Sequence, residues 1–96
     1  MEEKPHFSII IRNLTGRQIL YQTNPQKKEI VNHNNLIKLN DTTNITIKVS
    51  DSLIRFLYDS FQNTFTVLDP NRQVKLLQSS DQSFDFQLGE YNSAYS

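Results

Sequence analysis

The chain has 96 residues, the length of one small domain. Its 10 basic and 10 acidic residues give a formal net charge of +0 at pH 7, which argues against a large phosphate-binding footprint and so against nucleic acid as a partner. It contains no Cys, which excludes a disulfide framework and a thiolate metal site.

The other residues favour β-structure and indicate no membrane-spanning helix. Ile, Leu, Phe, Val and Tyr are plentiful whereas Ala occurs once, and large β-branched or aromatic residues are enriched in strands. A transmembrane helix needs about 20 consecutive apolar residues, and no apolar run here is longer than Ile9-Ile10-Ile11. Residues 1–6 lack the apolar core of a signal peptide, so we expect a cytoplasmic protein, or an extracellular one if the chain is a mature fragment.

The N-terminal quarter of the chain predicts a β-hairpin. Residues 7–14 alternate apolar and polar side chains, which is the pattern of a strand with one buried face. Thr15-Gly16 can form a tight turn, because glycine tolerates positive φ angles. Residues 17–22 then return as the second strand, and residues 23–28 form a polar loop around a proline.

This turn resembles turns in two groups of known proteins. Residues 9–25, with Leu14-Thr15-Gly16-Arg17 at the turn, resemble the first hairpin of the ubiquitin-like family. That resemblance implies an α+β interaction domain with an amphipathic helix after residue 25, where the Asn-rich segment 32–35 is poor helix material. An Asn-x-Thr-Gly turn, here Asn13 to Gly16, is also similar to the opening hairpin of many β-sandwich modules, among them membrane-active aegerolysin-like proteins.

The middle of the chain continues as short strands. Two apolar stretches, residues 29–31 and 36–39, are separated by an Asn-His-Asn-Asn turn. Residues 44–50 form the clearest strand, because three β-branched apolar residues alternate with polar ones. The outward sides of the strands at 36–39 and 44–50 carry Lys38 and Lys48, and we expect these two strands to be neighbours.

The segment 51–62 has two interpretations. As a strand, it places Ile54, Phe56 and Tyr58 on one face. As a short helix, its apolar stripe would run through every fourth residue from Leu53. The sequence favours the strand and leaves the helix open.

The C-terminal strands complete a sandwich pattern. Residues 64–68 and 73–78 flank a turn at 69–72, whose Asp-Pro pair favours a β-turn. Residues 83–88 alternate Phe, Phe and Leu with polar residues. Strands at this spacing predict an all-β domain, an antiparallel β-sandwich of seven or eight short strands. We expect this domain to span residues 7–88, between flexible ends at 1–6 and 89–96.

Candidate catalytic residues are sparse. The two histidines, His6 and His33, fall at the N-terminus and in the Asn-rich turn, and no nucleophile elbow or His-Glu-x-x-His pair occurs. Most aspartates stand at strand ends and turns, where Asp caps and solubilises. We therefore expect no catalytic residue, no metal ligand and no cofactor, in a protein that is not an enzyme.

The most informative feature is a set of apolar residues that alternation places on the outward side of the strands. A solvated sheet face normally carries polar residues, so these side chains need cover from a helix at 51–62, from the C-terminal tail or from a partner. We predict that they are partner-binding residues: Ile10, Leu20, Leu53, Leu57 and Leu77.

These observations predict a non-enzymatic protein–protein interaction or assembly module that acts through an outward apolar sheet face or an exposed edge strand. Its partner would be a second copy, giving a homo-oligomer, or another protein. The first alternative is a glycan- or lipid-binding β-sandwich, lectin-like or membrane-active, that uses the polar loops at 32–35 and 40–44, although no Trp is present to stack on a sugar. The second alternative is the ubiquitin-like interaction domain.

Overall fold

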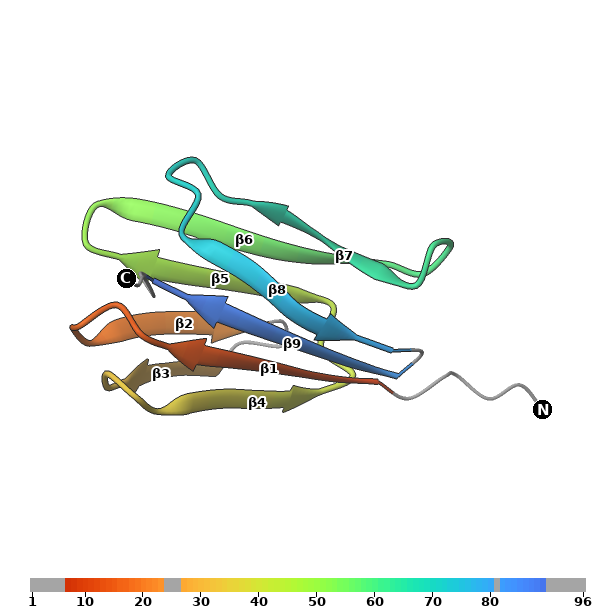
Figure 1. Cartoon of the computed structure of the whole chain (residues 1–96), viewed down its shortest axis with the longest axis horizontal. Helices are drawn as coiled ribbons and strands as arrows, with labels where there is room; N and C mark the ends of the chain where they lie inside the picture. Colours follow the sequence, from red (N-terminus) through yellow and green to blue (C-terminus); the bar gives the residue numbers. More distant parts are fainter. Residues whose placement is uncertain (1–6, 24–26, 81, 90–96) are drawn as a thin grey trace.

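Two β-sheets face each other in the structure, a computed structural model that describes residues 7–23, 27–80 and 82–89 (Figure 1). One sheet has four strands in the order β4-β1-β9-β8, and the other has five in the order β3-β2-β5-β6-β7. The predicted all-β sandwich is confirmed, although β1 and β9 run parallel and the described residues form nine strands rather than seven or eight. The strands are β1 (Ser8–Asn13), β2 (Ile19–Thr23), β3 (Lys27–Val31), β4 (Leu36–Asn40), β5 (Asn44–Val49), β6 (Ser52–Asp59), β7 (Thr64–Leu68), β8 (Val74–Ser79) and β9 (Ser83–Leu88).

The predicted hairpin of β1 and β2 is wrong, because the two strands lie in different sheets. β1 pairs antiparallel with β4 and parallel with β9, while β2 pairs with β3 and β5. Alternation defines which face of a strand is buried, but it does not define the neighbouring strand. The buried faces of β1 and β2, with Ile9 and Tyr21 among their residues, therefore meet across the core rather than side by side.

The segment 51–62 contains β6 and no helix. β6 pairs with β5 on one side and with β7 on the other, and its inward residues Ile54 and Phe56 are fully buried. A helix here would leave β5 and β7 without their shared neighbour. No helix occurs anywhere in residues 7–23, 27–80 and 82–89, so these residues contain none that could cross a membrane, and the ubiquitin-like α+β alternative is wrong.

β3 is longer than its apolar residues predict. It begins at Lys27, inside the expected loop at 23–28. Lys27 and Lys28 pair with Thr23 and Gln22 of β2 through the backbone. An edge strand needs no apolar side chain to extend a backbone ladder, and lysines are common on sheet edges.

The core fills the space between the two sheets. Aromatic contacts join them: the Phe56 ring of β6 packs edge-to-face on Phe86 of β9 with centroids 5.1 Å apart, and Phe7 stacks on Tyr58 at 4.2 Å. Aliphatic side chains from both sheets fill the rest. The fully buried large side chains are Ile9, Ile11, Ile37, Ile45, Ile47, Ile54, Phe56 and Leu88.

The corner between β1 and β2 is organised by Asn13, the one buried polar side chain in the described ranges. Its Nδ2 donates hydrogen bonds to the carbonyl oxygens of Arg17 (2.9 Å) and Val31 (3.0 Å). Its Oδ1 accepts from the N–H of Thr15 (3.0 Å) and from the Thr15 hydroxyl (2.7 Å). The amide thus uses both of its donors and both acceptor positions. In this chain the Asn-x-Thr-Gly motif, with Gly16 at a φ of 84°, turns the chain from one sheet to the other.

Gly89 closes this corner from the end of β9. Its φ is 106°, and its N–H donates to the carbonyl oxygen of Gln73 at 2.7 Å. The sequence pattern assigns Gly89 to a flexible tail at 89–96, yet the residue is buried. The rest of that tail, like residues 1–6, lies outside the described residues.

Candidate functional site

The outer face of the five-stranded sheet carries a group of aliphatic side chains on successive strands. Strand register places Leu20 of β2 beside Ile30 of β3 on one side and Lys48 of β5 on the other, and Lys48 beside Leu53 of β6. Ile30 and Leu53 are 64% and 55% exposed. We name this group the outer aliphatic surface; its members are Leu20, Ile30, Leu53, Leu57 and Leu68.

The structure brings together three of the five residues that the sequence predicts to bind a partner. Leu20, Leu53 and Leu57 lie on the outer aliphatic surface. Ile10 lies on the outward side of the four-stranded sheet. Leu77 lies at a β-bulge in the edge strand β8. The five therefore do not form one surface.

Two members of the surface, Ile30 and Leu68, were not predicted. Each directly follows or precedes a residue that faces inward: Ile30 precedes the buried Val31, and Leu68 follows Val67, which packs against the core. Alternation from those inward residues could have identified both. In residues 64–68 the same alternation that places Phe65 and Val67 inward also places Leu68 outward.

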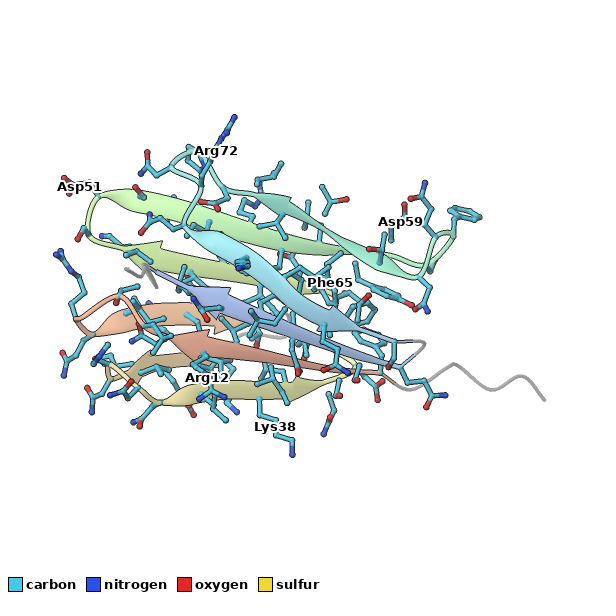
Figure 2. The ribbon with its side chains drawn as sticks, in the orientation of Figure 1. Arg12, Lys38, Asp51, Asp59, Phe65 and Arg72 are labelled. Carbon is cyan, nitrogen blue, oxygen red and sulfur yellow. The ribbon has the colours of Figure 1, made fainter. Side chains whose placement is uncertain are left out.

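Positive charge accompanies the outer aliphatic surface. Lys28, Lys48 and Arg55 lie on the same outer face, and the register sets Arg55 beside Leu68. Several carboxylates lie instead in turns or at strand ends, and Figure 2 shows Asp51 and Asp59 at opposite ends of β6. The outer face of this sheet is therefore locally basic although the formal net charge of the chain is +0.

Lys38 and Lys48 do not lie on neighbouring strands, contrary to the sequence-based expectation. Lys38 belongs to β4 of the four-stranded sheet, and Lys48 belongs to β5 of the five-stranded sheet. The two side chains point outward from opposite faces of the sandwich. They therefore cannot line one groove.

A cleft of about 470 Å³ opens between the edge strands β7 and β8. It is mostly apolar, and Asp69 and Arg72 lie at the turn that joins the two strands. Asp69 Oδ2 accepts a hydrogen bond from the N–H of Val74 at 2.7 Å, which fixes this turn. The apolar lining consists of Phe65, Val67, Val74, Leu76, Phe84 and Phe86.

His33 takes part in the corner next to β1. Its Nδ1 accepts a hydrogen bond from the N–H of Gly16 at 3.0 Å, in an exposed turn. Within the residues that the structure describes, no group of three or more His, Cys, Asp and Glu side chains could hold a metal ion. His6 lies outside the described residues.

The phenol of Tyr21 has a pKa that is clearly displaced from its ordinary value. Its hydroxyl donates to Glu29 Oε1 at 3.0 Å. Burial, then the hydrogen bond to Glu29 and then the charge of Glu29 raise the pKa of Tyr21 from 10.0 to about 12. Folding therefore favours the neutral phenol. This contribution to stability is present below pH 10 and is lost as the pH rises through about 12.

We expect a phenolate absorbance titration to show one tyrosine that ionises near pH 12 and disappears from the curve in Tyr21→Phe. Glu29→Gln should lower the pKa of Tyr21 because the negative charge is removed, but leave it above 10.0 because burial remains. A wild-type curve in which every tyrosine ionises near pH 10 would contradict this prediction.

The sequence matches no protein-family model, and the searches of curated proteins and of solved structures also give no match.

Proposed function

We propose that the chain is a non-enzymatic protein-binding module whose outer aliphatic surface docks an acidic, apolar segment of a partner protein. The observation that carries the proposal is the placement of five large aliphatic side chains on the outer face of one sheet, with three cations among them. Other described positions on the face carry mainly small or amide side chains, such as Thr46 and Gln22.

Exposure of these aliphatic side chains to water is unfavourable in the isolated chain. Burying one leucine side chain contributes about 1.5–3 kcal/mol relative to leaving it in water. Exposed apolar side chains that gather on one face mark interaction sites more often than single ones do. A partner that covers Ile30 and Leu53 would recover this free energy.

The cations define the chemistry of the partner. Lys48 lies between Leu20 and Leu53, and Arg55 lies beside Leu68, so charge and apolar area alternate across the surface. Carboxylates of a partner can pair with these cations while its apolar side chains contact the leucines. An acidic segment rich in large apolar residues satisfies both requirements.

A selection of phage-displayed random peptides on the immobilised protein tests the proposal. We expect enriched peptides to combine Asp or Glu with large apolar residues. Leu53→Asp and Lys48→Glu should each weaken their binding by at least about tenfold, because loss of one buried leucine or one paired cation is of that size. The matched control is Leu36→Asp, which changes a similarly exposed leucine on the other sheet and should leave binding unchanged.

Two outcomes would overturn the proposal. One is a selection without enriched peptides, or with peptides that bind Leu53→Asp as well as wild type. The other is co-flotation with phosphatidylserine vesicles that Leu53→Asp abolishes while no peptide binds, which would identify an anionic membrane as the partner. Thermal melts should confirm that each variant is folded.

A further inference from the structure

Within the part of the chain that the structure describes, the four edge strands of the sandwich differ in charge. β3 carries two lysines and a glutamate, β4 carries Lys38, and β8 carries Lys75 and a bulge near Leu77. Charges and bulges on an edge strand prevent pairing with another chain. β7, Thr64–Leu68, has no charged residue, no proline and no bulge. It is therefore the unprotected edge.

The backbone of β7 has groups available for pairing. The N–H of Tyr58 in β6 donates to Thr43, so the peptide groups of Tyr58 face β5. Peptide groups alternate in direction along a strand, so those of Leu57 and Asp59 face β7. Leu57 lies opposite Thr66 there. Thr66 thus bonds to β6. The backbone N–H and C=O groups of Phe65 and Val67 point to the free edge.

The sandwich is also open beside this edge. The cleft between β7 and β8 exposes Val67 and Leu76, and its floor is formed by phenylalanines of the core. Leu68 is 47% exposed on the outer side of the same strand. A chain that pairs with β7 would cover apolar side chains on both faces of the five-stranded sheet.

We propose that two copies of the chain pair antiparallel through β7, with Thr66 of each copy on a two-fold axis. Phe65 and Val67 then exchange backbone hydrogen bonds with Val67 and Phe65 of the second copy. The two five-stranded sheets become one continuous sheet, and the two open clefts face each other. This inference goes beyond the proposed peptide docking, because the pairing uses the β7 edge and not the outer aliphatic surface.

Charge complementarity selects a second copy as the occupant. Figure 2 shows Asp59 and Arg72 at opposite ends of the β6–β7 ribbon. A two-fold axis through Thr66 reverses one ribbon against the other, so Asp59 of each copy comes to the end that holds Arg72 of the other. At each end Asp59 of one copy thus approaches Arg72 of the other, while Asp69 in the same turn is engaged by the N–H of Val74; β7 itself carries no charge.

The proposed pairing also gives a contact to the exposed ring of Phe61. This ring is 98% exposed in the turn before β7. The pairing brings it to the turn of the second copy that contains Pro70 and Arg72, where proline and the guanidinium can pack on an aromatic face. In the single chain the ring is left in water.

Light scattering with size-exclusion chromatography, over a concentration series that reaches the millimolar range, tests the pairing. We expect a wild-type dimer. Thr66→Lys places two ammonium groups at the axis, and Val67→Pro removes an N–H that β6 does not use; each should raise the dimer dissociation constant by at least about tenfold. The matched control, Gln22→Lys, adds the same charge to the same outer face far from β7 and should remain dimeric.

A charge-reversal experiment tests the register. Asp59→Arg and Arg72→Asp should each weaken the dimer, because each places like charges together at both ends. An equimolar mixture of the two variants should restore dimers, since each contact then joins opposite charges. Within one chain the two positions lie at opposite ends of the ribbon, so only pairing between copies explains restoration.

A wild-type chain that stays monomeric would overturn the inference. So would a dimer that persists in both Thr66→Lys and Val67→Pro, or a mixture of the charge variants that stays monomeric. Peptide binding is measured separately with the Leu53→Asp variant. If the wild-type protein binds peptides but does not dimerise, only the pairing through β7 is wrong. If it dimerises but Leu53→Asp does not change peptide binding, only the proposed docking surface is wrong.

Discussion

Gly89→Ala is expected to lower the free energy of unfolding by about 4 kcal/mol. A Cβ on this residue would lie 2.6 Å from the carbonyl carbon and oxygen of Leu14 and 2.7 Å from the nitrogen of Thr15, all of them backbone atoms that cannot rotate away. The φ of 106° adds strain of about 1–3 kcal/mol for any other residue. Overpacking of a tight site costs a further 1–3 kcal/mol, roughly. Urea unfolding followed by circular dichroism measures the change.

Gly16→Ala is the matched control for this prediction. Gly16 also has a positive φ, 84°, but nothing lies within 4 Å of the position of a Cβ. Only the conformational strain remains, about 1–2 kcal/mol, and part of it is offset because alanine restricts the unfolded chain. Equal losses in the two variants would show that Gly89 is required for its φ alone and that the close approach to Leu14 is absent in solution.

Asn13→Ala is expected to lower the free energy of unfolding by about 3 kcal/mol and the melting temperature by more than about 10 °C. The substitution removes four hydrogen bonds at a fully buried position. It leaves the carbonyl oxygen of Val31 without this donor inside the protein, and an unsatisfied buried polar group costs about 1–3 kcal/mol. Calorimetry measures both quantities.

Asn13→Asp tests the hydrogen bonds that the amide donates separately from those that it accepts. The carboxyl keeps the shape and the oxygen that faces Thr15, but in its ionised form it has no donor for Arg17 and Val31. We expect it to be at least as destabilising as alanine at pH 7. A variant as stable as wild type would mean that water or backbone movement satisfies the two carbonyl oxygens, and that the corner does not depend on Asn13.

Much of the fold could be predicted from the sequence because alternation is a local property. Ile45, Ile47 and Val49 are inward and buried as the pattern indicates, and the Asp-Pro turn ends β7 as expected. The partner of each strand is not local. Residues 7–22 alternate identically whether β1 and β2 are neighbours or face each other across the core, and the turn motif between them is compatible with both.

The candidate site, too, could be predicted only where local alternation determines it. Leu20, Leu53 and Leu57 could be assigned to an outward face one strand at a time. That they share a surface which excludes Ile10 depends on the distribution of the strands between two sheets. The unprotected edge at β7 also could not be predicted, because a strand is an edge only once the order of the whole sheet is known.

The parallel pairing of β1 with β9 has a consequence for how the chain folds. The two strands are the first and the last of the nine, and β9 is also the only described neighbour of β8. During synthesis β1 leaves the ribosome long before β9 is translated, so one side of β1 stays unpaired until almost all strands have been made. Contacts between residues so distant in sequence raise the contact order, which slows folding. A nascent chain that stops before β9 therefore exposes unpaired backbone N–H and C=O groups along one edge of β1 and should depend on chaperones to avoid aggregation.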